Sequence, residues 1–310
     1  MPAQQKPTVR RKNSILSLSK DESPQLRRAL LAWHRRHALT APWRQTGDPY
    51  HVLVAAVMAQ QTQMSRVLLK FDEFISAFPT IERLAGARTA RVLRVWKGLG
   101  YNLRALRLHR AAKLIVRRGG FPRTAAELQQ IEGIGPFTAA IISSFAFREP
   151  VAAVDTNVRR VIARLSGDVD VTLTDRDVQP AADVLISRRA PARWNQAIMD
   201  LGGRVCVSRS PKCDVCPIAR WCRSRAAFDK SPRKVAERRA SYKPQPKFEG
   251  SRRYHRGRIV QALRELTEGR SLSPQQLGNK LGIDNIAELL DVLKRDGLIR
   301  RLPIGRVRLP

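Results

Sequence analysis

Residues 128–147 read LQQIEGIGPFTAAIISSFAF and interrupt a helical pattern with two glycines, Gly133 and Gly135. Glycine adopts tight backbone turns that other residues resist, so the segment predicts two helices joined by a short hairpin. The first N–H groups of the second helix would face outward and favour an anion such as a DNA phosphate. Taken alone, a G-I-G turn also fits a helix–helix connection in any helical bundle.

An aspartate opens the next helical segment. Residues 150–165 read PVAAVDTNVRRVIARL, in which Asp155 follows an apolar run and precedes residues with helical periodicity. Aspartate at such a position commonly caps a helix by accepting a hydrogen bond from the first turn. The residues alone therefore favour a capping role for Asp155, with a functional role as the alternative.

The four cysteines of the chain all stand within one short segment, at Cys206, Cys213, Cys216 and Cys222. A disulfide framework is disfavoured in a reducing cytosol, so a metal is the better use of these thiols. Structural zinc commonly takes two C-x2-C-like pairs set well apart, whereas one compact loop suits an iron–sulfur cubane. The spacing C-x6-C-x2-C-x5-C therefore favours a [4Fe–4S] cluster over zinc.

The composition of the chain points to a polyanionic partner. Its 58 Lys+Arg against 26 Asp+Glu give a formal net charge of +32. Such an imbalance destabilises a compact fold by self-repulsion unless a polyanion lies close by, so nucleic acid is the expected partner. A ribosome-type RNA binder is the alternative. Because the sequence shows neither a long apolar run nor a signal segment, we expect a cytoplasmic, nucleoid-associated protein without membrane contact.

Helical periodicity dominates the middle of the chain, and no stretch between residues 24 and 222 alternates like a strand for long. We therefore predict an all-α core at residues 23–225. A basic disordered arm at 1–22 precedes it, and a basic, proline-interrupted linker at 226–250 follows it. The last module, residues 251–310, resembles a winged helix, with three helices and a two-strand wing around Pro303 to Gly305. A small helical packing or dimerisation module is the alternative.

Taken together, IEGIGPFTA, VDTNVRRV and the four-cysteine loop resemble the helix-hairpin-helix DNA glycosylases with an iron–sulfur loop, the relatives of endonuclease III. The strongest similarity is to the adenine mismatch glycosylases, and it covers residues 26–224. The segments that carry it are APWR (41–44), DPYHVLVAAVMAQQTQ (48–63), FPTIERLA (78–85), VWKGLGYNLRALRLHRAA (95–112) and WNQAIMDLGGRVC (194–206).

This resemblance implies a two-lobed helical fold and an enzymatic activity. A six-helix barrel at about 46–155 would be inserted into a cluster lobe made of residues 23–45 and 156–225, and the four cysteines would hold a [4Fe–4S] cluster. Asp155 becomes the expected catalytic residue, supported by Asn157. A carboxylate stabilises the oxocarbenium-like sugar that forms when the bond between base and sugar breaks.

The resemblance also assigns residues to the DNA. Gln61 and Tyr101 are expected to enter the duplex around the extruded nucleotide, which must leave the base stack before it can react. Their alternative is ordinary helix-surface or core packing. The full set of expected DNA contacts is Arg44, Gln60, Gln61, Tyr101, Gly133, Ile134, Gly135 and Thr138.

Two positions depart from the family pattern. Phe137 stands where bifunctional relatives carry a lysine nucleophile, so we expect base excision without strand cleavage. Ala56 stands where adenine glycosylases place the glutamate that protonates the departing purine. His51 is the conceivable substitute acid. In addition, the large C-terminal domain with which adenine glycosylases recognise oxidised guanine is not evident.

Three functions therefore compete at this point. The first is a monofunctional glycosylase for uracil or thymine opposite guanine, or for an alkylated or deaminated base, since these bases leave without that glutamate. The second is an adenine mismatch glycosylase with a rerouted proton donor. The third is a catalytically silent lesion sensor. For all three we expect a monomer that binds double-stranded DNA with a mismatch or lesion.

Overall fold

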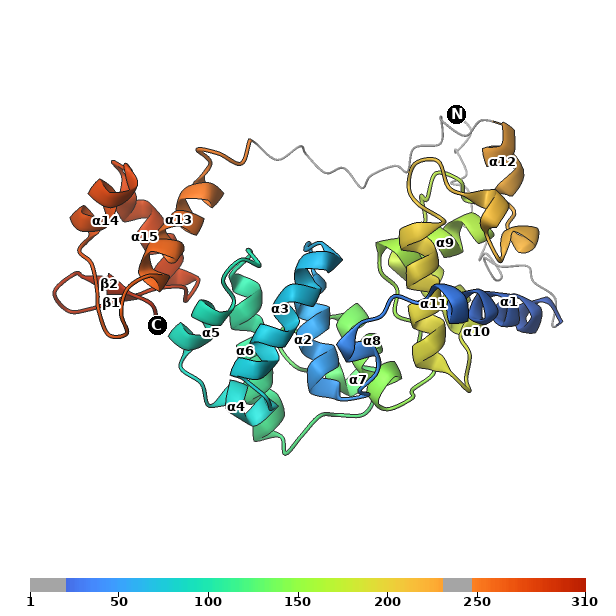
Figure 1. Cartoon of the computed structure of the whole chain (residues 1–310), viewed down its shortest axis with the longest axis horizontal. Helices are drawn as coiled ribbons and strands as arrows, with labels where there is room; N and C mark the ends of the chain where they lie inside the picture. Colours follow the sequence, from blue (N-terminus) through green and yellow to red (C-terminus); the bar gives the residue numbers. More distant parts are fainter. Residues whose placement is uncertain (1–20, 231–246) are drawn as a thin grey trace, which may run out of the picture. The chain divides into compact units, whose positions relative to one another are not determined.

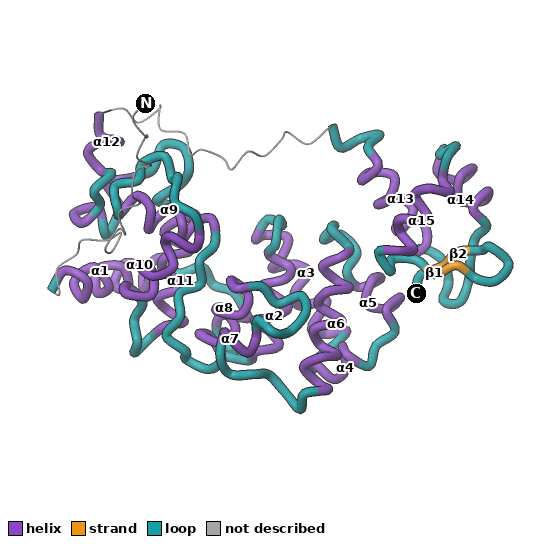
Figure 2. The backbone as a smooth tube through the Cα atoms, turned by 180° about the vertical axis from the view of Figure 1, so that it is seen from behind, coloured by secondary structure: helices purple, strands orange, loops and turns teal. Residues whose placement is uncertain are grey.

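The computed structural model describes residues 21–230 and 247–310, and these divide into two compact units (Figures 1 and 2). Of the described residues, the first unit joins 21–39 with 148–230, and the second unit joins 40–147 with 247–310. Most of the expected arm and most of the expected linker lie outside the described residues. Among the residues that the structure describes, no helix is long and apolar enough to cross a membrane.

The first unit is a bundle of helices followed by the cysteine loop. Its core is built around Trp194, which is fully buried among apolar side chains of neighbouring helices. Thr174 begins α10 with a capping box, in which its hydroxyl and the side chain of Asp177 bond reciprocally to main-chain N–H groups. The elements are α1 (Glu22–His37), α9 (Thr156–Leu165), α10 (Asp175–Leu185), α11 (Pro191–Arg204), η2 (Cys213–Val215), η3 (Ala219–Trp221) and α12 (Arg225–Lys230).

The helix α12 lies where the sequence predicted the start of the linker. Phe228 is buried, and the guanidinium carbon of Arg164 lies 4.7 Å from the centre of its ring. This contact anchors the chain beyond the cysteine loop. The linker therefore does not begin at residue 226, and residues 231–246 lie outside the described part of the chain.

The larger part of the second unit is a barrel of helices. Helix α2 is its centre, because every side chain from Val52 to Met58 is buried and α2 contacts helices α3, α6 and α8. The elements are η1 (Pro42–Arg44), α2 (Pro49–Ala59), α3 (Met64–Ala77), α4 (Ile81–Ala85), α5 (Thr89–Val95), α6 (Leu103–Arg117), α7 (Ala125–Leu128) and α8 (Pro136–Ala146).

Both ends of α2 have a physical cause. Asp48 caps the first turn through a 2.7 Å hydrogen bond from the Tyr50 N–H to its carboxylate, and proline occupies the first helical position. The helical pattern of the sequence runs on from α2 towards residue 78, but the chain breaks at residues 60–63. There Gln61 adopts a φ of +56°, in the left-handed region that ends a helix.

The border between the units differs from the sequence prediction, which placed the barrel at about 46–155. Residues 148–155 belong to the first unit instead. The fully buried Asn195 accepts a 2.9 Å hydrogen bond from the Ala153 N–H and donates a 3.0 Å bond to the Val151 carbonyl. These bonds tie the extended segment before Asp155 to α11.

The C-terminal module contains α13 (Arg252–Arg264), α14 (Pro274–Leu281), α15 (Ile286–Arg295) and an antiparallel pair of short strands. Strands β1 (Arg300–Arg301) and β2 (Val307–Arg308) pair Arg300 with Arg308, and the turn between them holds Pro303 to Gly305. Leu272 adds an isolated bridge to Val307. Three helices and a hairpin stand at the positions that the sequence predicted, while the assignment of the module to the winged helices stays a prediction.

Candidate active site and cluster loop

Asp155 is the N-cap of α9. One carboxylate oxygen accepts a 2.7 Å hydrogen bond from the Val158 N–H, and the other accepts a 3.2 Å bond from the side-chain amide of Asn157. Burial raises the pKa of Asp155, and the bonds from Val158 and Asn157 and the charge of Arg160 only partly oppose this effect. Asp155 therefore caps α9, as the residues alone predicted, and it is also a buried carboxylate with a perturbed pKa, as expected of a functional residue.

Arg160 connects Asp155 to the cysteine loop. Its Nη2 donates 2.8 Å and 2.7 Å hydrogen bonds to the Asn157 amide oxygen and the Gly202 carbonyl, and its Nε donates a 2.7 Å bond to the Cys206 carbonyl. A chain of side-chain hydrogen bonds thus runs from the first cysteine to the carboxylate. No sequence pattern indicates this role, because Arg160 stands in a basic segment among other arginines.

Gly202 lets α11 pass close to this network. A Cβ atom at Gly202 would lie 2.8 Å from the Cβ of Asn157 and 3.0 Å from its carbonyl oxygen. Real Cβ atoms do not approach other atoms so closely, so any larger residue would push Asn157 and its hydrogen bonds aside. The close approach of two helices explains the glycine at this position.

The four cysteines line one pocket in the first unit, together with Arg164 and Phe228. Burial raises the pKa of Cys216 to about 12 and that of Cys222 to about 11, and the thiols of Cys206 and Cys213 contribute to both shifts. Thiolates in this setting need a cationic partner, which iron supplies. Among the described residues, no three His, Cys, Asp or Glu side chains are grouped to hold a single metal ion.

Arg164 holds the start of the cysteine loop through hydrogen bonds to its main chain, and the arginine is only 1% exposed. It donates 2.8 Å and 3.0 Å hydrogen bonds to the carbonyls of Val207 and Ser208, and its Nη1 lies 3.5 Å from the Cys206 Sγ. A fixed positive charge beside a thiolate stabilises the ionised sulfur that binds iron. The donor set and its charge therefore fit an iron–sulfur cluster.

The glycine hairpin lies in the second unit, between α7 and α8. Gly133 has a φ of +93°, and a Cβ there would lie 3.3 Å from the Arg107 Cβ and carbonyl oxygen, so only glycine fits. Gly135 is the N-cap of α8, and the N–H groups of its first turn have no partner within the helix. The side chains of Ile134 and Thr138 are buried, so DNA contact at these positions would use the main chain.

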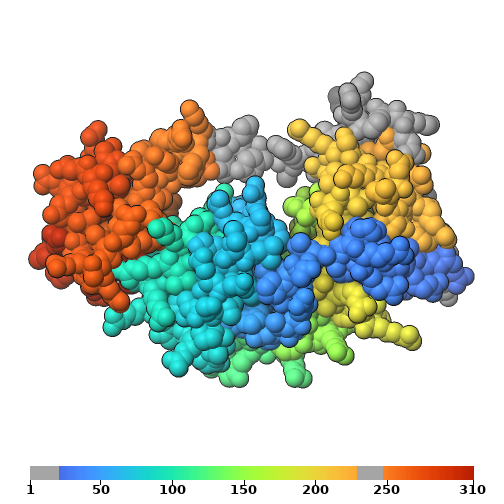
Figure 3. All heavy atoms as spheres, viewed as in Figure 1, coloured from blue at the N-terminus to red at the C-terminus, as the bar shows by residue number. Residues whose placement is uncertain are grey.

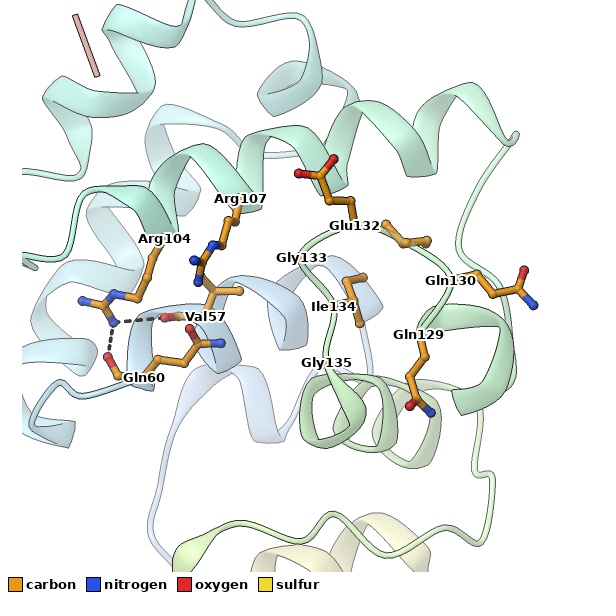
Figure 4. Close-up of a pocket in the computed structure, with 11 residues that line it drawn as sticks. Val57, Gln60, Arg104, Arg107, Gln129, Gln130, Glu132, Gly133, Ile134 and Gly135 are labelled. Carbon is orange, nitrogen blue, oxygen red and sulfur yellow. Dashed lines mark hydrogen bonds between the residues drawn. The ribbon is translucent and has the colours of Figure 1, made fainter. Parts of the chain in front are cut away.

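An open pocket of about 560 Å³ lies beside the hairpin (Figure 4). Gln60 at the end of α2 and the neighbouring side chains Arg104 and Arg107 of α6 form one side of it, and the Gly133–Gly135 turn lies on the other. Arg107 is exposed and brings a positive charge to the pocket. Sequence reasoning missed Arg107, although its place six residues after Tyr101, on the same helix as Arg104, could have indicated it.

Arg104 holds the loops that contain Gln61 and Tyr101 from inside the barrel and is only 5% exposed. Its guanidinium donates to carbonyls at the end of α2 and to carbonyls just before Tyr101. The acceptors are the carbonyls of Val57 (3.1 Å), Met58 (2.8 Å), Gln60, Leu99 (2.8 Å) and Gly100 (3.4 Å), and the hydroxyl of Thr62 (3.0 Å). Five donors in a rigid plane make arginine suited to such a position.

The two loops present the residues that the resemblance assigned to the duplex. Gln61 and Tyr101 are both exposed, and Tyr101 keeps 57% of its surface free. Both have positive φ, +56° and +42°, which is strained for residues other than glycine. The Tyr101 ring lies 5.5 Å from the Arg104 guanidinium carbon. Core packing, the alternative for Tyr101, does not describe its environment.

The remaining predicted residues lie around α2 and α8. Ala56 is 8% exposed on α2, and Phe137 is half-buried in the first turn of α8. His51 packs edge-on against Phe71 with ring centres 5.7 Å apart. Five residues along an α-helix correspond to a rotation of about 140°, so His51 and Ala56 face different sides of α2. This arrangement argues against His51 as the substitute acid. Arg44 ends the short helix η1 and is half-buried.

Family models match two parts of the chain. The HhH-GPD superfamily base excision DNA repair protein model matches residues 54–184, and the iron–sulfur binding domain of endonuclease III matches residues 206–222. An adenine DNA glycosylase of Mycobacterium tuberculosis is 34% identical over 291 residues, covering 91% of this chain and 92% of that protein. A human adenine DNA glycosylase is 36% identical over 213 residues, covering 64% of this chain and 39% of the human protein.

Solved structures share the fold. A thermostable thymine-DNA glycosylase has a TM-score of 0.62 and 25% identity, covering 66% of this chain and 97% of that one. A trapped endonuclease III–DNA covalent intermediate has a TM-score of 0.57 and 21% identity, covering 68% and 99%, which shows the fold alone.

A helical fold with a glycine hairpin and a four-cysteine loop defines the helix-hairpin-helix class of DNA glycosylases. The chain belongs to the HhH-GPD superfamily of base excision DNA repair proteins, with the iron–sulfur motif of endonuclease III. It is therefore a hydrolase that acts on N-glycosyl bonds of DNA, and its cofactor is a [4Fe–4S] cluster. The fold class and cofactor predicted from the sequence are confirmed.

Substitution of Asp155 by asparagine separates chemistry from stability. The raised pKa means that the folded protein binds a proton more tightly than the unfolded chain, whose aspartates titrate near ~3.9. Folding stability is therefore lost as pH rises through this window, and the buried carboxylate costs stability at pH 7. We expect Asp155→Asn to abolish excision and yet unfold in urea at pH 7 no earlier than the wild type, since asparagine also caps helices.

The pH profile checks the same point. Wild-type excision should fall as pH drops through the raised pKa of Asp155, because protonation removes the stabilising charge. An acid limb at the ordinary aspartate pKa, or an Asp155→Asn protein that unfolds much earlier, would show that burial does not dominate at this site.

Arg104→Met should destabilise the barrel by roughly 2–4 kcal/mol, since it leaves several buried carbonyls without a donor. Arg107→Met is the matched control: it removes the same charge from the same helix at an exposed position, and its stability change should stay within about 0.5 kcal/mol. Urea unfolding at pH 7 measures both. Equal stability of the two variants would contradict the clamping role of Arg104.

Proposed function

We propose that this glycosylase is monofunctional and removes a mispaired pyrimidine, uracil or thymine opposite guanine. Ala56 carries the proposal. A departing adenine needs protonation on its ring, and a general acid typically contributes about 10²- to 10⁴-fold to such a step. Ala56 cannot supply that proton, and His51 faces another side of the helix. Uracil and thymine leave as comparatively stable anions, and alkylated purines are already cationic before the bond breaks, so that they leave as neutral bases.

Asp155 would act on the sugar. Its carboxylate is held by Val158 and Asn157 in a fixed orientation, which suits stabilisation of a positive charge at the sugar carbon and orientation of the attacking water. The [4Fe–4S] cluster would be held by Cys206, Cys213, Cys216 and Cys222, and when bound it fixes the fold of this loop. Through Arg160, the position of the loop bears on the position of Asn157.

Hydrolysis without strand cleavage is part of the proposal. Phe137 offers no amine that could attack the sugar and form a Schiff base. The expected product is an intact strand with an abasic site. Cleavage of the strand without alkali would overturn this point.

The proposed DNA contacts combine the hairpin with the two exposed loops. The main chain at Gly133 to Gly135, with Arg107 across the pocket, would hold a phosphate, while Gln61 and Tyr101 would enter the duplex. Arg44 and Gln60 add contacts nearby. We infer that the protein acts as a monomer on mismatched or damaged duplexes in the cytoplasm, with an affinity that falls steeply with salt.

Adenine mismatch excision is the second candidate. Its support is that the relatives aligned along nearly the whole chain are named adenine DNA glycosylase. It requires another residue to deliver the proton that Ala56 cannot. The likeness to a structure named thymine-DNA glycosylase supports the first candidate.

A single-turnover panel tests the two candidates. One duplex sequence carries U·G, T·G, A·8-oxoguanine, A·G, hypoxanthine or an alkylated purine, and hot alkali reveals the abasic sites formed by wild type and Asp155→Asn. Excision of uracil or thymine that vanishes in the variant is the expected result. Preferred excision of adenine would overturn the first candidate in favour of the second. Tight binding of lesion DNA without any excision would overturn both.

Ala56→Glu tests the leaving-group argument directly. Restoring a carboxylic acid at this position should raise adenine excision by about 10²-fold or more, while excision of uracil or thymine changes little. Ala55→Glu is the control, because it adds the same group about 100° away on the same helix. Equal adenine excision by both variants, or none by either in folded protein, would contradict the role assigned to position 56.

A further inference from the structure

The C-terminal module is attached to the barrel by specific contacts within the second unit, and the module (orange to red) lies against the teal part of the barrel in Figure 3. The Ala90 N–H donates a 2.9 Å hydrogen bond to the Pro310 carbonyl, and the Arg94 guanidinium donates a 3.3 Å bond to the Leu266 carbonyl. These contacts place Pro310 beside the start of α5, and the turn that follows α13 beside the end of α5.

Arg264 makes the contact that matters most for the site. Its Nη2 donates a 2.7 Å hydrogen bond to the side-chain oxygen of Asn102. Arg264 lies at the end of α13 and is half-buried, and burial lowers its pKa to about 10. A desolvated guanidinium makes a short, strong hydrogen bond, because water no longer competes for its protons.

Asn102 directly follows Tyr101 and is the N-cap residue of α6. An asparagine at this position commonly caps its own helix, but the Asn102 side chain accepts no such bond from α6. Its oxygen is instead turned to Arg264. The side-chain oxygen of Asn102 therefore accepts a hydrogen bond from the C-terminal module instead of capping α6.

The bonds from Arg104 of the barrel hold the loop around Tyr101 on the side that precedes Tyr101. Arg104 bonds to the carbonyls of Leu99 and Gly100, which precede Tyr101. Tyr101 itself has a strained φ of +42° and an exposed ring. A strained backbone at Tyr101 needs both of its chain neighbours to be held. Arg104 holds Gly100 before it, and the bond from Arg264 holds Asn102 after it.

We propose that the C-terminal module positions Tyr101, and that Arg264 does so by holding Asn102. The proposal rests on the proposed function, in which Tyr101 enters the duplex beside the extruded nucleotide. Arg264 is a positioning residue: it acts through Asn102 on the angle at which the ring is presented. Small displacements of such a group cost much of the rate, because extrusion and reaction need a defined geometry.

Arg264→Met is the principal test, with Arg252→Met as the matched control. Both remove one positive charge from α13, but Arg252 is exposed and pairs with Glu288 of the module rather than with the barrel. We expect Arg264→Met to lower single-turnover excision by on the order of 10-fold, whereas Arg252→Met stays at the wild-type rate. Asn102→Ala should match Arg264→Met, and the double variant should be no slower than either single one.

Two further readouts separate positioning from general damage. Amide hydrogen exchange at residues 98–103 should accelerate in Arg264→Met and Asn102→Ala but not in Arg252→Met. The fluorescence of 2-aminopurine placed next to the extruded nucleotide should show a smaller change on binding the same two variants. Equal behaviour of Arg264→Met and Arg252→Met would overturn the proposal. A wild-type Asn102→Ala beside a slow Arg264→Met would also overturn it, since the module would then act by another route.

Tyr101→Ala distinguishes the failure of this proposal from the failure of the proposed function. If Tyr101→Ala excises at the wild-type rate while Arg264→Met still loosens residues 98–103, the role of Tyr101 in the duplex is wrong. If Tyr101→Ala is slow while Arg264→Met and Asn102→Ala are both normal, the role of the module is wrong.

Discussion

The hydrogen bonds donated by the Arg160 guanidinium are the constraint on which the first unit depends. They join the carbonyl of Cys206 to the side chain of Asn157, which in turn bonds to Asp155. The cysteine loop and the carboxylate of Asp155 are therefore parts of one network. Through this network, the position of the cysteine loop bears on where the side chains of Asn157 and Asp155 stand.

Buried and half-buried arginines perform the same task elsewhere in the molecule. Arg104 holds the loops of Gln61 and Tyr101, Arg164 holds the cysteine loop, and Arg264 joins the C-terminal module to Asn102. The net charge of +32 indicates nucleic acid, but part of it lies inside the protein as main-chain clamps. Arginine suits this use because its planar group donates to several carbonyls at once and stays charged when desolvated.

The candidate site balances stability against chemistry at two positions. Asp155 caps α9 well, but the burial that orients it also raises its pKa and opposes its charged form. Ala56 fits comfortably in the buried face of α2, where a carboxylic acid would be costly to bury without partners. A family member that needs no acid for its leaving base is free of that cost.

The sequence alone determined the features that depend on short segments: the glycine hairpin, the helix that begins at Asp155, the cysteine spacing and the all-α class. Each arises from residues a few positions apart, where turn, capping and ligand geometry act locally. Only the tertiary structure decided that Ile134 and Thr138 are buried, that α12 continues past residue 226, and what the clamping arginines hold. The most distant of their partners in the sequence lie 46 residues from Arg160 (Cys206), 47 from Arg104 (Val57) and 162 from Arg264 (Asn102), and no local pattern encodes a contact over such distances.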